Sequence, residues 1–396
     1  MTKLTNKQQQ NRAAILEVLY TKRPISRIKI SHLTGITPAT VTDITTDLIN
    51  DGIIYEIGRD TVESSGSGRR PILLDIAKEA AYFIGIELSE KFFTFCLSDN
   101  LGNIYNKSIF KSGKDFFDIN VDFLIDKLKV FLEKNEEFTI NAIGIALPGH
   151  LNINDYKIIT NNTIWKDFNL QKFKDSFDIP IYTENNVNCM ALSVLLFNTV
   201  RRRENFIYYH IGRGMFCSYI HDGEIYSKNN FLIGEIGHTI VNPEGQKCEC
   251  GKNGCLQTYS SEAWILKKSR TLYNNSNTTF LRQFASTADD IDIDTIINAY
   301  EIGDEGVLNI INTAIKYLSI SLTNLSMILD TNINYIHSEL FKNNSLSQEL
   351  IDNVNSHSSI LPIDEATSTE ILKYSDLDGA IGACSLAVKY NLINSI

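Results

Sequence analysis

Residues 234–259 read GEIGHTIVNPEGQKCECGKNGCLQTY and contain four candidate metal ligands. The ligands follow the spacing H-x9-C-x-C-x4-C and are His238, Cys248, Cys250 and Cys255. One imidazole and three thiolates form a ligand set typical of tetrahedral structural zinc. Gly251 and Gly254 permit the tight turns that bring the sulfurs onto one ion. Because protein groups fill all four positions, the sequence predicts a structural Zn²⁺ with no position for a catalytic water. The alternative is a loop of buried cysteines without metal.

The cysteine count and the N-terminus bear on the compartment. The chain has seven cysteines, an odd number, and three of them fall within eight residues. Such clustering favours metal binding in a reducing compartment over disulfides. No apolar run reaches the roughly 18 residues of a membrane span. Residues 1–10 are polar and lack the apolar stretch of a signal peptide. We therefore expect a cytoplasmic protein without membrane segments.

Length and charge predict more than one domain. A chain of 396 residues exceeds one ordinary core. Its net charge is −10, but the charge is uneven. Residues 1–75 contain ten basic and eight acidic side chains, and the remainder contains 27 basic and 39 acidic ones. A mildly basic head on an acidic body suits a small DNA-binding module attached to a larger domain.

The first 75 residues show three short helical patterns. The first covers about residues 7–20. The second is capped by Ser26, and we expect it to bury a face formed by Ile28, Ile30 and Leu33. After a turn at Gly35, Thr37 caps a third helix that starts at Pro38 and runs to about residue 50. A helix, a short turn containing glycine and a second helix form a helix-turn-helix arrangement.

Short side chains at the start of the third helix suit contact with base edges and phosphates in a major groove. Residues 59–71 read RDTVESSGSGRRP, which resembles a flexible wing with two arginines at its base. The predicted DNA-contacting residues are Ser26, Thr37, Pro38, Ala39, Thr40, Thr42, Asp43, Arg69 and Arg70. The alternative is a helical dimerisation or adaptor module followed by a solvated linker.

From residue 80 onwards the pattern changes to strands. Apolar runs at 82–88, 91–97 and 104–109 predict an antiparallel meander, followed by a helix at about 121–133 and a strand at 142–146. Strands at 206–211 and 216–220, joined by Gly212-Arg-Gly214, repeat this signature about 120 residues later. Two copies of one unit suggest a duplicated two-lobed α/β fold with a ligand cleft between the lobes.

The cysteine-rich segment resembles the ROK family, named for repressors, open reading frames and kinases. Its G-E-x-G-H and C-x-C-G-x-x-G-C patterns are the family hallmark, and four further segments match. They are Gly144-Ile-Ala-Leu-Pro-Gly149, Asn161 with Trp165, Glu184-Asn185-Asn186-Val187-Asn188, and Asp378-Gly-Ala-Ile-Gly-Ala383. The resemblance extends over nearly the whole chain, and the N-terminal part resembles the winged helix of the xylose and N-acetylglucosamine repressor branch.

The resemblance implies an α/β fold: an N-terminal winged helix-turn-helix followed by a two-lobed actin-like (ribonuclease-H-like) sugar-kinase architecture. The expected DNA-binding domain is 1–78 and the expected sugar-sensor domain is 79–396. Within the sensor, the first lobe is expected at about 79–188 plus 379–396, and the second, with the zinc loop, at about 189–378.

Carrying the family's sugar contacts over by position gives Asn161, Asn185, Asn186, Glu235, His238 and Gln257. A carboxylate accepts two hydroxyl hydrogen bonds, and asparagine amides both donate and accept. If one nitrogen of His238 binds zinc, the other remains to donate to a hydroxyl. The alternative for the two asparagines at 161 and 185 is turn chemistry. Sugar-binding members carry Glu where Gln257 stands, which leaves the identity of the ligand open.

The phosphate-transfer machinery of the family kinases is altered in this chain. Their general base is the Asp of E-N-D, and Asn186 stands there, whose amide cannot take a proton at neutral pH. In the first phosphate loop Ser89 replaces glycine, and Glu90 adds a negative charge. Residues 212–214 replace the second loop G-T-G, and residues 334–339 lack the late glycine pair. The sequence therefore predicts a sensor without phosphotransfer activity.

We interpret the chain as a DNA-binding transcriptional repressor of carbohydrate genes that responds to a sugar. The expected assembly is a homodimer on a pseudo-palindromic operator, with a tetramer as the alternative. There are two alternative interpretations of the chain. One is a sensor that binds a protein partner, such as a sugar transporter component, and the other is an active sugar kinase that also binds DNA. Activation in place of repression would use the same operator contacts.

Overall fold

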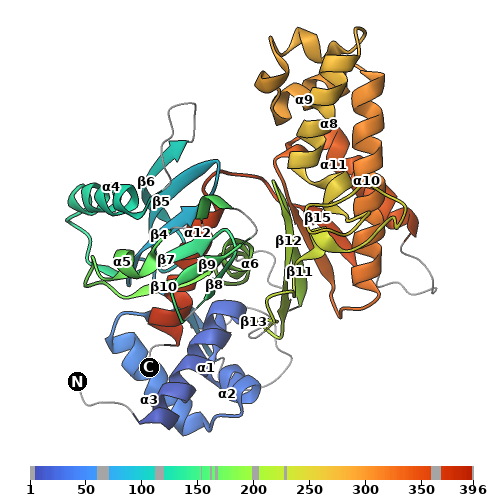
Figure 1. Ribbon diagram of the computed structural model, residues 1–396. Coiled ribbons are helices and arrows are strands. Elements are labelled where there is room, and N and C mark those ends of the chain that lie inside the picture. Colours follow the sequence, from blue (N-terminus) through green and yellow to red (C-terminus); the bar gives the residue numbers. More distant parts are fainter. Residues whose placement is uncertain are drawn as a thin grey trace. The chain divides into compact units, whose positions relative to one another are not determined.

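The computed structural model describes residues 5–59, 71–111, 120–152, 154–160, 163–165, 168–198, 205–226, 230–357 and 367–394. The chain divides into two compact units (Figure 1). The first unit consists of Met1–Arg202 and Asp376–Ile396, and the second of Arg203–Ser375. Among the described residues, no helix is both long and apolar enough to cross a membrane.

The chain begins with three helices whose starts are set by capping side chains. They are α1 (Asn6–Lys22), α2 (Arg27–Thr34) and α3 (Pro38–Asn50). The Ser26 hydroxyl accepts from the backbone N–H of Lys29 at the start of α2, and Thr37 accepts from Thr40 at the start of α3. Gly35 ends α2 at φ +69°, a left-handed conformation that glycine adopts without strain. Both predicted caps and the predicted turn are confirmed.

A small antiparallel sheet, in the order β1-β3-β2, packs with these helices. Its strands are β1 (Ile25–Ser26), β2 (Ile54–Arg59) and β3 (Ile72–Ile76). The predicted apolar face of α2 is wrong in part: Ile30 is buried, whereas Ile28 is 74% and Leu33 48% exposed. Ile28 and Ile30 lie two positions apart, about 200° around a helix, and so cannot share one face. We call α1–α3 with β1–β3 the head.

The rest of the first unit is built on a five-stranded sheet in the order β10-β7-β4-β5-β6. Its strands are β4 (Tyr82–Leu88), β5 (Phe92–Asp99), β6 (Ile104–Lys111), β7 (Ile140–Leu147) and β10 (Ile181–Asn185). The first three form an antiparallel meander, and β7 and β10 join in parallel. A separate hairpin pairs β8 (His150–Asn152) with β9 (Lys157–Ile159).

Helices from distant parts of the chain cover this sheet. They are α4 (Val121–Glu133), the 3₁₀ turn η1 (Thr163–Trp165), α5 (Leu170–Lys174), α6 (Asn186–Phe197), α12 (Asp378–Ala387) and the π-helix η6 (Val388–Ile393). Glycine lets α12 lie against the sheet, because a Cβ at Gly85 or Gly144 would overlap the backbone of α12. The first unit includes all of α6, whereas the expected first lobe stopped at residue 188.

The second unit contains another five-stranded sheet, in the order β13-β12-β11-β14-β15. Its strands are β11 (Phe206–Ile211), β12 (Met215–His221), β13 (Glu224–Ile225), β14 (Ile333–His337) and β15 (Ser368–Ile371). Its helices are η2 (Ile236–His238), α7 (Gln257–Ser260), α8 (Glu262–Asn275), η3 (Phe280–Gln283), η4 (Ala288–Asp290), α9 (Ile293–Glu301), α10 (Glu305–Ser326), η5 (Leu340–Lys342) and α11 (Asn344–His357).

The two large sheets share one topology. In each, three consecutive strands form an antiparallel meander, and two later strands add in parallel beside the first strand of the meander. Each sheet has its own apolar core, around Phe93 and Trp165 in the first unit and around Tyr209 and Leu318 in the second. The duplicated two-lobed α/β fold expected from the repeated strand signature is therefore confirmed.

Candidate functional site

Four side chains of the second unit converge on one point. His238 lies at the end of η2, and the three cysteines lie on the following segment. One ligand atom from each of His238, Cys248, Cys250 and Cys255 lies within 4.8 Å of all the others. The segment closes on itself through an isolated bridge between Lys247 and Asn253, so we call residues 247–255 the metal loop. Positive φ angles at Gly251 and Gly254 allow its turns.

Two of the six separations between the ligand atoms match those around a tetrahedral ion, and all four ligand atoms lie within 4.8 Å of one another. Cys248 Sγ lies 3.6 Å from His238 Nδ1, and Cys250 Sγ lies 3.6 Å from Cys255 Sγ. A tetrahedral zinc with Zn–S bonds of about 2.3 Å and Zn–N bonds of about 2.1 Å separates two sulfurs by about 3.8 Å and a sulfur from a nitrogen by about 3.6 Å. Burial, and then the nearby Lys252 ammonium, lower the pKa of His238. This favours the neutral imidazole that a metal requires. The cluster therefore fits a metal ion held entirely by protein.

Gln257, predicted as a sugar contact, directs its amide nitrogen at the metal loop. The nitrogen donates to Cys248 Sγ at 3.3 Å and to Glu249 Oε1 at 2.9 Å, and the residue is 5% exposed. Gly237 leaves room for the amide, since a Cβ there would lie 3.1 Å from Gln257 Oε1. An N–H donor on a ligating sulfur is the kind of outer contact that orients metal ligands.

Glu235 stands just before η2, three residues from His238. The side chain is half-buried, and burial raises the pKa of its carboxyl group. Among the described residues, none donates a hydrogen bond to this carboxylate. Because His238 faces the thiols through Nδ1, its Nε2 lies on the opposite edge of the ring. The second unit thus holds two polar groups next to the metal loop that suit hydroxyl recognition.

The predicted sugar contacts of the first unit lie at the start of α6. Asn185 caps this helix: its Oδ1 accepts from the N–H of Val187 at 2.9 Å and of Asn188 at 3.4 Å, and its Nδ2 donates to Gly149 O. Asn186 Oδ1 accepts from Val187 at 3.0 Å. Helix capping accounts for the two Oδ1 contacts of Asn185, whereas its Nδ2 bonds to a distant backbone oxygen. Asn161 lies outside the described residues.

The sequence did not predict that Glu87, in β4, is buried with a raised pKa. It is 4% exposed, and burial and the nearby Asp378 carboxylate raise the pKa of Glu87 to about 8, opposed by a hydrogen bond from Asn186. A Cβ on Gly379, at the start of α12, would overlap the Glu87 carboxyl group. The one sequence feature that could have indicated this burial is an acidic residue inside the apolar run at 82–88. Its burial is produced by α12, which arrives from the far end of the sequence.

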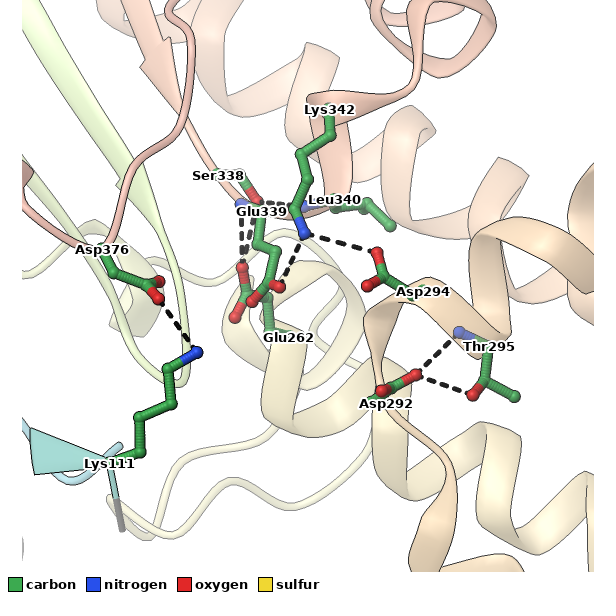
Figure 2. Close-up of polar contacts among 10 residues, drawn as sticks. All are labelled: Lys111, Glu262, Asp292, Asp294, Thr295, Ser338, Glu339, Leu340, Lys342 and Asp376. Carbon is green, nitrogen blue, oxygen red and sulfur yellow. Dashed lines mark hydrogen bonds and ion pairs between the residues drawn. The ribbon is translucent and has the colours of Figure 1, made fainter. Parts of the chain in front are cut away.

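Two segments of the second unit that are altered from the kinase pattern are bonded to one buried glutamate. Glu262, at the start of α8, accepts from Ser338 Oγ at 3.3 Å and from the Glu339 N–H at 3.2 Å (Figure 2). The Glu262 N–H donates to Gly212 O at 2.9 Å. Lys342 in turn contacts Glu339 and Asp294 (Figure 2). The Glu262 carboxylate therefore occupies the N–H of Glu339 and adds negative charge there, an unfavourable setting for a nucleotide phosphate.

The predicted DNA-contacting residues fall into three groups. Five at the start of α3 are exposed and one is half-buried; the exposed ones are Thr37, Pro38, Ala39, Thr42 and Asp43, and the other is Thr40. Ser26 is only 8% exposed, and its hydroxyl is used as the α2 cap. Arg69 and Arg70 lie outside the described residues.

Comparison with known proteins adds relatives along most of the chain. The ROK family pattern matches residues 83–390. The xylose repressor of Bacillus spizizenii is 30% identical over 318 residues, covering 80% of this chain and 78% of that protein. The DNA-binding transcriptional dual regulator NagC of Escherichia coli is 26% identical over 314 residues, covering 78% and 75%.

Solved structures agree in fold. A ROK family transcriptional regulator, a homolog of the E. coli MLC protein, superposes with a TM-score of 0.77 at 21% identity, covering 99% of this chain and 98% of that one. A ROK hexokinase from Thermus thermophilus gives a TM-score of 0.63 at 18% identity, covering 77% and 97%. With the family pattern, the repressor relatives and the duplicated fold together, this chain belongs to the ROK family.

Proposed function

We propose that this chain is a sugar-responsive transcriptional repressor whose head binds operator DNA. The observation that carries the proposal is that one chain joins a helix-turn-helix head to a region that matches the ROK family. The exposed start of α3 follows a helix and a glycine turn, and the ROK pattern begins shortly behind it at residue 83. Relatives named as xylose and N-acetylglucosamine repressors support the same role.

The head suits a winged-helix mode of DNA binding. In this mode α3 enters the major groove with its N-terminal residues towards the bases, and β2 and β3 form the base of the wing. Two heads in a homodimer would read a pseudo-palindromic operator. Selection of binding sites from random DNA with the full-length protein tests this: we expect inverted half-sites, spaced by about one or two helical turns.

The effector we propose is a monosaccharide, and D-xylose is the first to test because of the named xylose repressors. In the second unit, the Glu235 carboxylate can accept from sugar hydroxyls, and the Nε2–H of His238 can donate to one. A metal on Nδ1 would fix the tautomer and orientation of that imidazole. We propose structural zinc as the metal, because one imidazole and three thiolates are a typical zinc ligand set, and the Cys248–His238 and Cys250–Cys255 separations match those around tetrahedral zinc.

We further propose that the chain does not transfer phosphate. Asn186 offers no base for a sugar hydroxyl proton. Buried Glu87 lies against Asn186 and Gly379, and Glu262 contacts the 338–339 backbone. A coupled assay for sugar-dependent ADP release with ATP and a sugar panel is expected to stay at background, and turnover above background would contradict this part.

The effector proposal is tested by thermal unfolding of the zinc-loaded protein with a panel of monosaccharides. A ligand at about 100 times its Kd stabilises the folded state by about 2.7 kcal/mol. We expect D-xylose to raise the midpoint, Glu235→Ala to abolish the rise, and Glu244→Ala, at an exposed glutamate further along the chain, to preserve it. If no sugar or sugar phosphate raises the midpoint, the second unit does not bind a sugar, and the effector is of another class, such as a protein partner.

A further inference from the structure

The last helical segment of the chain is tied to the first helix by an ion pair between a buried lysine and a glutamate whose side chain is 37% exposed. Lys389 of η6 is 4% exposed, and its Nζ lies 2.8 Å from Oε1 of Glu17 in α1. Next to it, Arg12 of α1 donates through Nη1 to the backbone oxygen of Leu392 at 3.0 Å. Burying an ammonium is costly unless a partner is held in place. The pair therefore favours one fixed position of α1 on η6.

A second tie joins α1 to the β5–β6 turn. Tyr20 is fully buried, and its hydroxyl donates to the backbone oxygen of Asn100 at 3.0 Å. Asn100 is itself fully buried, and its side chain donates to Ala77 O at 2.8 Å and accepts from the Ala80 N–H at 3.0 Å. Asn100 thus holds together the head, the connection at 77–80 and the sheet of the first unit.

The helices behind these ties have little room to move. The segment α12–η6 starts at Gly379 against Glu87 and ends at α1, and the red C-terminal end lies beside the blue N-terminal helices (Figure 1). The α6 helix starts at the Asn185 cap and ends at Phe197, whose ring packs on Gly102 in the β5–β6 turn. The helices α12 and α6 are in contact through their backbones, since a Cβ on Gly382 of α12 would lie 2.6 Å from the carbonyl carbon of Cys189 in α6.

We propose that Lys389 and Asn100 are positioning residues for DNA binding: they clamp the head to the sheet of the first unit, so that head and sheet move as one body. We call these two ties the clamp. A flexibly tethered head would have an exposed, weakly bonded connection. Here Lys78 and Glu79 are exposed, but the buried Asn100 is hydrogen-bonded to the backbone at both ends of the connection, at Ala77 and Ala80. An effector would then act on the operator by reorienting the whole first unit, not by releasing the head.

The clamp is tested by a charge swap in the full-length, zinc-loaded protein. Amide hydrogen exchange is measured in α1 and in η6 for Glu17→Lys, Lys389→Glu and the double variant. We expect each single variant to speed exchange in both segments by about tenfold or more, and the double variant to restore most of the protection. The control is Lys172→Glu, at the exposed pair Lys172–Asp122 of the same unit, which should leave α1 unchanged.

Tyr20→Phe provides a milder variant that keeps the buried ring and loses only the bond to Asn100. It is expected to speed α1 exchange without unfolding the sheet. Unchanged α1 exchange in Tyr20→Phe and in Glu17→Lys, or a double swap that restores nothing, would overturn the clamp. Exchange in this experiment requires neither operator nor sugar, so its result stands apart from the proposed function.

A second readout separates positioning from mere stability and rests on the proposed function. It is the ratio of operator affinities without and with D-xylose, for an operator obtained by selection. We expect this ratio to fall towards one in Lys389→Glu and to recover in the double swap, while D-xylose still raises the unfolding midpoint. A ratio that stays at the parent value despite fast α1 exchange refutes the positioning role. If the parent protein binds the operator equally well with and without D-xylose, so that the ratio is one, D-xylose is not the effector. Amide exchange alone then tests whether the clamp exists.

Discussion

At the scale of single residues, Gln257 shows how the structure separates two roles that its position allows. Its amide nitrogen donates to Cys248 Sγ and to Glu249 Oε1, so its contacts are with the metal loop. Outer-shell donors of this kind typically change metal affinity by about 10- to 100-fold when removed. We expect Gln257→Ala to weaken zinc binding by an amount in that range, measured by competition with a colorimetric chelator.

The matched control for this prediction is Gln246→Ala, an exposed glutamine beside the same loop. It should bind zinc like the parent protein. If Gln257→Ala retains the parent zinc affinity but loses stabilisation by D-xylose, then Gln257 is a sugar contact, as its sequence position suggested.

Glu87 predicts a dependence of stability on pH in the first unit. Its pKa is about 8 in the folded chain against an ordinary value of 4.5, so folded protein keeps a proton that unfolded protein releases. The stability that this difference gives is fully present below pH 4.5 and is lost as pH rises through 8, at up to about 1.4 kcal/mol per unit of pH. Glu87→Gln removes the titration, so its stability relative to the parent should rise between pH 6 and pH 8.

The measurement is urea unfolding followed by the fluorescence of Trp165, which lies in the core of the first unit. Trp264→Phe removes the signal of the second unit from the background. Glu133→Gln, at an exposed glutamate ending α4, serves as the control and should track the parent at both pH values. A Glu87→Gln protein that differs from the parent by the same amount at pH 6 and pH 8 would show that Glu87 is ionised throughout.

At the scale of elements, the cap of α3 links the local sequence to the proposed binding of DNA by this helix. The Thr37 hydroxyl accepts from the Thr40 N–H and lies 2.9 Å from the Thr40 hydroxyl. Losing such a cap costs about 1 kcal/mol, equivalent to about fivefold faster amide exchange through local opening. Thr37→Ala should show this acceleration in α3 together with weaker operator binding. Thr46→Ala, whose hydroxyl bonds back to Thr42 O within α3, should leave the helix start protected.

The same elements show which features of the fold the sequence could predict. The helix at 121–133, the strand at 206–211 and the helix starts at Ser26 and Thr37 match because each depends on a local signal, an apolar period or a cap. The predicted face of α2 is wrong because Ile28 and Ile30, two positions apart, lie on different sides of the helix.

The candidate site was predictable to a similar extent. The four candidate metal ligands come together because a short, glycine-containing segment carries three of them and the fourth lies only ten residues earlier. The Gln257 contact and the burial of Glu87 were not predictable. The first depends on the direction of one amide, and the second on the packing of α12 across nearly 300 residues of chain.

At the scale of the whole molecule, the metal cluster and the head belong to different units. Each unit contains one of the two tryptophans, Trp165 in the first and Trp264 in the second. Single-tryptophan proteins made by Trp264→Phe or Trp165→Phe therefore report the unfolding of one unit at a time.

Removing the metal should destabilise the second unit alone. Zinc, as proposed for the metal loop, would contribute directly to folding, because its ligands would otherwise be free to separate. With a strong chelator, the Trp264 signal should unfold at lower urea concentration, while the Trp165 signal and amide protection in α1 stay the same. Cys250→Ser should reproduce the Trp264 shift, and chelator should then add nothing. If both tryptophan signals shift together, the two units unfold as one cooperative body, and the metal loop stabilises the head as well as the sensor.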